Sequence, residues 1–143
     1  MKDVVINIKG IQFVDGEEDS VEITMVGKMG ERNGKTLLMY EESDQITGAK
    51  TTNTLKIKGE ESVTIVKSGG ELSRMEIEMG RRNTGHYSTG HGDLMLGVFG
   101  EKLVNELNDC GGRFFARYTL DINSNLISRN ELEISVQPAN RRR

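Results

Sequence analysis

His86 and His91 are the two histidines of the chain, and they flank a polar segment that also contains Ser88 and Asp93. Residues five apart on a strand point to opposite faces, so the pair could hold one metal ion only if the turn at Gly90 folded the two rings together. Neighbours on one strand also do not converge as the serine and histidine of a hydrolase must, and the chain has no Gly-x-Ser-x-Gly motif. We therefore expect no metal site and no catalytic triad here, and no cofactor in the protein.

Basic residues gather just before these histidines. Lys67, Arg74, Arg81 and Arg82 lie in and around two successive predicted strands of a chain whose formal net charge is −3. A guanidinium group binds carboxylates and phosphates through paired N–H donors. If two or more of these side chains pointed into an enclosed interior, they would hold an anionic ligand; if they pointed outward, they would form a solvated face. Because Arg81 and Arg82 are adjacent, at most one of them faces inward on a regular strand.

Polar and amphipathic residues are spread over several predicted strands, and the set comprises Tyr40, Thr52, Thr54, Tyr87, Tyr118 and Asn130. A ligand in an enclosed interior is held by a few such groups among apolar side chains. Threonine and tyrosine are also common in ordinary strands, so the pattern has a purely structural explanation as well. From these two sets, and from His86 just after the basic residues, we select as candidate ligand-binding residues Arg74, Arg82, His86, Tyr40, Tyr87, Tyr118 and Asn130.

The elements that would position these residues are strands joined by turns. The chain contains 17 glycines and one proline, and the glycines cluster with Asn, Asp and Ser, as in Asp15-Gly16 and Asn33-Gly34. Glycine, and to a lesser extent Asn and Asp, adopts the positive φ that tight hairpin turns require. Between the turns apolar and polar residues alternate, which is typical of strands with one buried face. The predicted strands are Val4–Phe13, Val21–Met25, Lys35–Glu42, Thr51–Lys58, Ser62–Lys67, Met75–Met79, Asn83–Thr89, Leu94–Phe99, Phe114–Ile122 and Leu132–Val136.

One segment is ambiguous. In Glu101–Asn108, the residues Leu103, Val104 and Leu107 also fit one face of a helix. No other ten-residue stretch is convincingly amphipathic at the helical period.

About ten strands joined by short turns favour a meander, in which neighbours in sequence pair in space. An open meander of this size would leave two exposed edges, each a template for aggregation, and closing the sheet removes both. The fold class that we expect is therefore all-β, an antiparallel up-and-down β-barrel of about eight to ten strands that forms a single domain over residues 1–143. A β-sandwich is the alternative, with Glu41–Lys50 as the one connection long enough to cross over.

Composition and charge exclude several classes of protein. A net charge of −3 and an aromatic content of 5% without tryptophan argue against a nucleic-acid-binding protein. No segment approaches the roughly 20 apolar residues of a membrane span, and the N-terminus lacks the apolar core of a signal peptide. Cys110 is the single cysteine, so no intramolecular disulfide forms. We expect a cytoplasmic protein without nucleic-acid or membrane partners.

Several short motifs occur along the chain in a characteristic order. They are Asp15-Gly16-Glu17-Glu18-Asp19, Tyr40-Glu41-Glu42-Ser43, Thr47-Gly48, Thr51-Thr52-Asn53-Thr54-Leu55-Lys56-Ile57, Gly80-Arg81-Arg82, Tyr87-Ser88-Thr89, Gly111-Gly112, Tyr118-x-Leu120-x-Ile122-Asn123 and Ile127-Ser128-x-Asn130-Glu131-Leu132. In these motifs the chain resembles the uncharacterised bacterial YwiB-like family, a domain of unknown function assigned to the calycin (lipocalin-like) β-barrel superfamily. The resemblance spans essentially the whole chain and implies a calycin-like barrel, but it implies no activity because the family has none established. The chain departs from the family after Thr89, where Gly90-His91-Gly92 stands in place of a proline and an aromatic residue before the glycine.

Three hypotheses for the function follow. The first is a non-enzymatic barrel that binds a small ligand, anionic or amphipathic, in its interior. The second is a filled barrel that self-associates, for example as a homodimer, through outward apolar residues, for which the candidates are Met95, Phe99 and Phe115. The third is a hydrolase-type enzyme that uses His86 with a carboxylate such as Glu41 or Glu131. Among these, we expect a binding protein rather than an enzyme.

Overall fold

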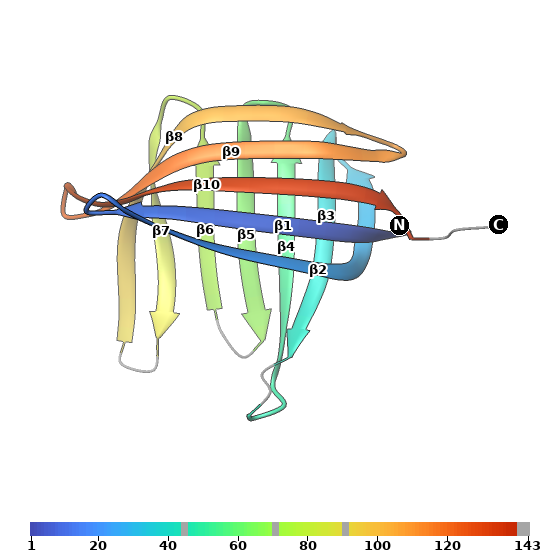
Figure 1. The fold of residues 1–143 in the computed structure, drawn as a ribbon, viewed down its shortest axis with the longest axis horizontal. Coiled ribbons are helices and arrows are strands. Elements are labelled where there is room, and N and C mark those ends of the chain that lie inside the picture. Colours follow the sequence, from blue (N-terminus) through green and yellow to red (C-terminus); the bar gives the residue numbers. More distant parts are fainter. Residues whose placement is uncertain (44–45, 70–71, 90–91, 140–143) are drawn as a thin grey trace.

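The chain is built from strands throughout, as the computed structural model shows (Figure 1). The structure describes residues 1–43, 46–69, 72–89 and 92–139, without the side chains of residues 72, 87–89, 92 and 93. Over these ranges the strands are β1 (Lys2–Val14), β2 (Glu17–Arg32), β3 (Lys35–Ser43), β4 (Lys50–Lys58), β5 (Ser62–Gly69), β6 (Leu72–Glu78), β7 (Arg82–Thr89), β8 (Gly92–Asn108), β9 (Gly111–Ile122) and β10 (Asn125–Pro138). Each strand predicted from the sequence is present, and β2, β8 and β10 extend well beyond their predicted bounds.

The first and last strands pair with each other and close the sheet. β1 pairs with β10 in antiparallel register from Val4↔Pro138 to Phe13↔Arg129, and with β2 on its other side. The order around the closed barrel is β1-β10-β9-β8-β7-β6-β5-β4-β3-β2, so that all neighbours except β1 and β10 also follow each other in sequence. The predicted up-and-down barrel is therefore confirmed, and the sandwich alternative is wrong.

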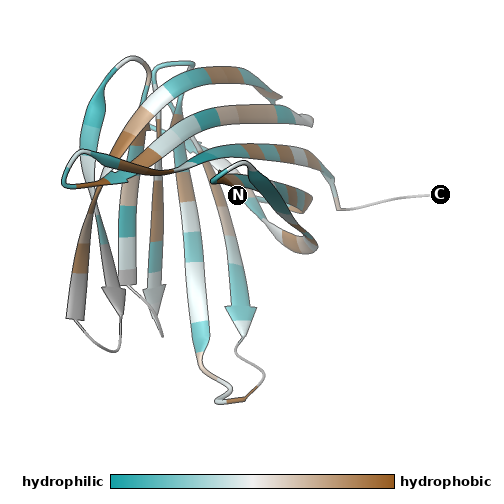
Figure 2. Cartoon of the chain, turned by 60° about the vertical axis from the view of Figure 1, so that its left-hand side comes forward, coloured by the Kyte–Doolittle hydropathy of each residue, from teal (hydrophilic) through white to brown (hydrophobic). Residues whose placement is uncertain are grey.

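The barrel is flattened into two layers whose strands cross (Figure 1). β1, β2, β9, β10 and the second part of β8 run side by side through one layer, and β3 to β7 run at a steep angle to them in the other, with the first part of β8 beside β7. Polar and apolar residues alternate along the strands of both layers (Figure 2). The inward faces meet in a core whose buried side chains are Val4, Ile6, Met29, Leu38, Leu55, Ile57, Val63, Ile77, Val98, Leu103, Phe114, Ala116, Ile134 and Val136.

Two-residue turns join the first three strands. Asp15 and Gly16 have φ angles of 50° and 81°, and Asn33 and Gly34 have φ angles of 52° and 77°. Positive φ at both central residues is the type I′ geometry, whose twist matches that of the paired strands. The Asp-Gly and Asn-Gly motifs therefore fix where β2 begins and ends.

The ambiguous segment Glu101–Asn108 continues β8 and pairs with β9 as far as Asn108↔Gly111. The register shifts between Gly100 and Lys102, which makes Glu101 the extra residue of a β-bulge. Leu103 and Leu107 are four residues apart, a spacing that suits one face of a strand as well as one face of a helix, and both contact the core.

Candidate ligand-binding site

β2 and β3 part at one point, and a groove opens there. Their pairing runs from Arg32↔Lys35 only as far as Lys28↔Met39. Among the described residues, residues 17–27 of β2 pair with β1 alone, and residues 40–43 of β3 pair with β4 alone. The groove at this split, the β2–β3 groove, has a volume of about 420 Å³ and is lined on its two sides by Val26, Gly27 and Lys28 of β2 and by Met39, Tyr40 and Glu41 of β3.

The walls of the β2–β3 groove are amphipathic. Val26 is 66% exposed, and Met39 is half-buried. Beside them Nζ of Lys28 lies 2.6 Å from Oδ1 of Asp3, and the hydrogen bond and charge of Lys28 hold the pKa of Asp3 below its usual range. The groove therefore offers apolar contacts next to an ion pair and to the exposed carboxylate of Glu41, a combination that suits an amphipathic molecule.

Gly27 allows β2 and β3 to approach each other at the base of the groove. It is buried, and a Cβ at this position would lie 2.4 Å from the carbonyl oxygen of Met39 and 2.7 Å from Cδ1 of Ile6. Any side chain at position 27 would push the two strands apart, so this glycine sets the position of the split.

Four polar side chains form a cluster on the inner face next to the groove: Tyr40, Glu42, Asn53 and Lys67. Tyr40 and Glu42 follow the buried Leu38 at alternate positions of β3, and the registers place Asn53 opposite both Tyr40 and Lys67. Nδ2 of Asn53 donates a hydrogen bond to Oε1 of Glu42 at 2.9 Å, and Nζ of Lys67 lies 3.9 Å from the same oxygen. We call these four residues the polar cluster; it shares Tyr40 with the groove.

Asn53 is the buried member of the polar cluster. It is 1% exposed, and its Oδ1 has no hydrogen-bond partner among the described residues. A buried acceptor without a partner costs about 1–3 kcal/mol of stability, and native proteins contain few such groups. The neighbouring inward residues of β4, Leu55 and Ile57, fill the core with apolar side chains. A polar residue kept in this row at a cost in stability is expected where it serves binding.

Burial, together with a smaller effect of the negative charge of Glu42, raises the pKa of Tyr40 to about 12. Its hydroxyl group is therefore protonated at neutral pH and can donate a hydrogen bond. The polar cluster thus presents a hydroxyl, an amide, a carboxylate and a basic side chain within one region of the inner face.

Tyr118 and Asn130 come together at a second hollow on the inner face of β1, β2, β9 and β10. The registers place Asn130 opposite Tyr118 on β9 and opposite Gln12 on β1. This hollow has a volume of about 200 Å³ and includes Gly10, where an added Cβ would meet no atom within 4 Å. Nδ2 of Asn130 donates to Oγ of Ser128 at 3.0 Å, and burial raises the pKa of Tyr118 to about 12. We call this site the Gly10 hollow.

The basic candidates join neither site. Arg74 and His86 are cross-strand partners on β6 and β7, are exposed, and lie on the outward side of their strands. Arg82 also faces outward, where its guanidinium group donates two hydrogen bonds to the carboxylate of Asp121. These residues would bind an anion in the interior only if they pointed inward, and they do not. Lys67, which the sequence grouped with them but which we did not select, is the basic residue that faces the interior.

Two further predictions fall outside the described residues. The backbone of Tyr87 pairs with Ser73 and Leu94, but its side chain and the whole of His91 lie in the parts of the chain that are not described.

Within the described ranges no three His, Cys, Asp or Glu side chains form a group that could hold a metal ion. The same ranges contain no helix with the length and apolar character needed to cross a membrane.

The sequence interpretation missed Glu42, Asn53 and Lys67 as a group. One signal for Asn53 was present, because it stands two and four residues before Leu55 and Ile57 and so shares their buried face. No comparable signal joins Glu42 and Lys67 to it, since their proximity depends on two strand registers.

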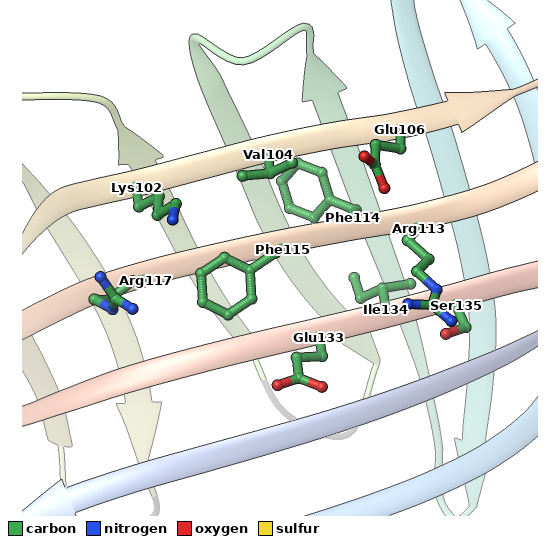
Figure 3. Close-up of a pocket in the computed structure, with 10 residues that line it drawn as sticks. All are labelled: Lys102, Val104, Glu106, Arg113, Phe114, Phe115, Arg117, Glu133, Ile134 and Ser135. Carbon is green, nitrogen blue, oxygen red and sulfur yellow. The ribbon is translucent and has the colours of Figure 1, made fainter.

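An open depression of about 530 Å³ surrounds Phe115 on the outer face of β8, β9 and β10 (Figure 3). The guanidinium carbon of Arg117 lies 5.7 Å from the centroid of the Phe115 ring. The other two apolar residues predicted for this face, Met95 and Phe99, are 57% and 37% exposed. In the register of β8 and β9, the pair Lys102↔Arg117 lies between Phe99 and Phe115, so charged side chains interrupt the predicted apolar patch. Self-association through it stays a prediction.

Comparison with known proteins settles the family. A family model described as a domain of unknown function, DUF1934, matches residues 6–134. The chain belongs to this family. The crystal structure of the ywiB protein from Bacillus subtilis is similar to the DUF1934 barrel described here over 97% of this chain and 93% of that chain, with a TM-score of 0.84 and 18% sequence identity. At this identity the likeness shows the fold alone. No match to the chain was found among curated proteins.

The resemblance to the YwiB-like family, inferred from short motifs, is confirmed by both comparisons. Membership of the DUF1934 family assigns no activity to the chain, and the wider calycin superfamily stays a prediction. A function for this DUF1934 barrel must therefore be argued from the geometry of its sites.

Proposed function

We propose that the DUF1934 barrel binds a small amphipathic molecule in the β2–β3 groove. The observation that carries the proposal is the composition of the groove, in which the apolar surface of Val26 and Met39 adjoins Tyr40 of the polar cluster. Its volume of about 420 Å³ lies within the range of small-molecule sites, which combine mostly apolar walls with a few polar groups.

The polar cluster suggests which chemical groups the ligand carries. Oδ1 of Asn53 is an acceptor that needs a donor, so the ligand supplies a hydroxyl or an amine. In the register of β3 and β4, Tyr40 lies directly opposite Asn53, and Glu42 lies two residues farther along β3, opposite Thr51. Val26 lies on the outward side of β2 and Asn53 on the inward side of β4, so a ligand with an apolar tail on Val26 reaches Asn53 with a hydroxylated head group by passing between β2 and β3 beside Tyr40.

The charges favour a neutral ligand over an anionic one. Arg74, Arg82 and His86, which suggested an anion, lie on the outer face of the barrel. The basic residue of the polar cluster, Lys67, lies beside the carboxylate of Glu42 and is largely balanced by it. An ester or alcohol therefore fits better than a phosphate or a free carboxylate.

The enzyme hypothesis gains no support from the strand order. β7, which carries His86, is separated from β10 and Glu131 by two strands and from β3 and Glu41 by three. At a strand spacing of about 4.8 Å these separations are roughly 14 Å and 19 Å along the sheet. Neither carboxylate is in a position to orient His86 as a general base.

The proposal is tested by titrating the ¹⁵N-labelled protein with three probes and following amide chemical shifts. The probes are monooctanoylglycerol below its micelle concentration, octanoate with a similar tail and a negative charge, and inorganic phosphate without a tail. We expect saturable shifts from monooctanoylglycerol at residues 26–28, 39–41 and 52–53, weaker shifts from octanoate and none from phosphate. The absence of saturable shifts from monooctanoylglycerol, or shifts confined to the outer face around Phe115, would show that the proposal is wrong.

A further inference from the structure

Within the described part of the chain, β2 has an edge without a neighbouring strand along most of its length. Val14↔Glu17 and Arg32↔Lys35 flank two-residue turns, so each is a hydrogen-bonded pair of its hairpin. The N–H and C=O groups of successive residues point alternately to the two sides of a strand. Both hairpins therefore indicate that the backbone groups of odd-numbered residues of β2 point toward β1 and those of even-numbered residues point toward the β3 side. Among the described residues no strand occupies that side between residues 18 and 26.

This edge offers a regular series of backbone donors and acceptors. The residues whose N–H and C=O groups point to it are Glu18, Ser20, Glu22, Thr24 and Val26, and at 3.3 Å per residue they span roughly 26 Å. The edge is long enough to pair with a complete strand.

The inner surface next to the edge is also uncovered. Val21 lies on the inward side of β2, opposite Gly10, yet it is 66% exposed. It lines the Gly10 hollow together with Tyr118 and Leu132. β4, β5 and β6 of the other layer continue beyond the edge of β2 (Figure 1), so the layer that contains β2 is too narrow to cover them.

We infer that an extended peptide segment of a partner protein adds to the free edge of β2 as a further strand, with basic residues facing outward and apolar residues facing inward. A strand that adds to a sheet edge gains affinity from main-chain hydrogen bonds and specificity from pockets for alternate side chains. The inward residue opposite Val21 enters the Gly10 hollow. This inference is independent of the ligand proposed for the β2–β3 groove.

Charge selects the partner. Four acidic residues lie at the start of the edge: Glu18 and Glu22 on the outward side of β2, where the basic residues of an added strand would lie, and Glu17 and Asp19 on the inward side. They repel a second copy of this chain, whose corresponding edge carries the same charges, and they attract lysine or arginine at alternate positions of an added strand. The occupant is therefore a basic segment of another protein rather than a second copy of β2.

The test uses a blocked nine-residue peptide that alternates lysine and valine. One control peptide replaces each lysine with glutamate, and a second has the same composition with its lysines and valines in two separate blocks. In the free protein we expect fast hydrogen exchange at the amides of Ser20, Glu22, Thr24 and Val26. The alternating Lys–Val peptide slows exchange at these amides and binds more weakly as salt is added, whereas neither control peptide protects them.

Two variants separate the edge from the hollow. Ser20→Pro removes a donor that points to the free edge and leaves the bonds to β1 intact, and proline is tolerated in edge strands. Gly10→Leu fills the hollow and leaves the edge intact; because its Cβ meets no atom within 4 Å, this variant decides the test if Ser20→Pro does not fold. We expect each to weaken peptide binding at least tenfold, while Met39→Asp, which alters the β2–β3 groove from its β3 side, still binds the peptide.

Four results would overturn the inference: no binding of the Lys–Val peptide, equal binding of the block peptide, protection of amides outside β2, or binding that both Ser20→Pro and Gly10→Leu leave unchanged. Protection of the same amides that rises with protein concentration, without peptide, would also overturn it, because a second copy would then occupy the edge. Loss of monooctanoylglycerol binding alone would contradict only the proposed function.

Discussion

Arg82 and Asp121 are joined by hydrogen bonds of 2.7 and 3.0 Å although β8 lies between their strands. The position between them is Gly97 of β8, where a Cβ would lie 2.3 Å from Nη2 of Arg82 and 2.5 Å from Oδ1 of Asp121. The ion pair therefore depends on a glycine at position 97. It connects β7 to β9 and commits Arg82 to a structural contact on the outer face.

Gly97→Ala is expected to break this ion pair without unfolding the protein, because the atoms in the way are the ends of two flexible side chains. The pKa of Asp121, now held below its usual range by the hydrogen bonds and charge of Arg82, should rise toward its ordinary value. The measurement is an NMR titration of the side-chain carboxyl carbon of Asp121. Gly10→Ala, whose Cβ meets no atom, is the control. An Asp121 pKa that is the same in Gly97→Ala and wild type would contradict the assignment.

The same ion pair makes stability depend on acid pH. The pKa of Asp121 is lower in the folded than in the unfolded chain. The stability that ionised Asp121 contributes is therefore fully present above its pKa in the unfolded chain and is lost as pH falls through its pKa in the folded chain. We expect the difference in urea midpoint between wild type and Asp121→Asn to shrink on going from about pH 6 to about pH 2. If the difference in urea midpoint does not change over this range, the ion pair of Asp121 with Arg82 does not stabilise the folded protein.

Asn53→Leu is expected to make the protein more stable and to abolish binding in the β2–β3 groove. The substitution removes a buried acceptor without a partner and continues the apolar row of Leu55 and Ile57, so the free energy of unfolding should rise by about 1–3 kcal/mol. Urea denaturation measures this gain, and Asn53→Ala, which leaves a cavity, should gain less. If Asn53→Leu is less stable than wild type, the Asn53 amide is satisfied in the folded protein and the argument for a binding role fails.

Tyr118 should make stability fall at alkaline pH. Burial raises its pKa to about 12 in the folded protein, above the unfolded value of about 10. Its contribution is therefore present below about pH 10 and is lost as pH rises through the folded value, by up to about 2–3 kcal/mol for a shift of this size. The stability difference between wild type and Tyr118→Phe should decrease over this range. The Tyr87→Phe variant retains only Tyr40 and Tyr118, and its tyrosine absorbance can be followed as pH rises. If either tyrosine ionises with the ordinary pKa of about 10, the two side chains are not both buried.

The sequence predicted the barrel because two local signals agree along the whole chain. Asp15-Gly16 and Asn33-Gly34 mark hairpins by their turn chemistry, and alternation marks the buried face of each strand. Closure followed from the need to pair the edges of β1 and β10, and the structure shows that pairing. The free edge of β2 was not foreseen, because the point where β2 and β3 part depends on how the two layers cross and not on any local pattern.

The candidate site was predicted only in part, and for a physical reason. Tyr40, Tyr118 and Asn130 have inward positions, and for Tyr118 the alternation along Phe114–Ile122 indicated it. Arg74 and His86 do not, since grouping by charge ignores the side of the strand on which each residue lies. To predict which polar residues on different strands lie close together, one must know the register between the strands, and the sequence of one strand does not contain it.

The central claim is that the β2–β3 groove binds an amphipathic molecule, and two valines of β2 test it most directly. Val21 and Val26 are both 66% exposed, but Val26 lines the groove and Val21 does not. Calorimetric titration with monooctanoylglycerol should show binding that Val26→Asp weakens about tenfold or more, equivalent to about 1.4 kcal/mol, and that Val21→Asp changes by less than about twofold. Equal affinities for the two variants, or no binding to the wild-type protein, would contradict the account.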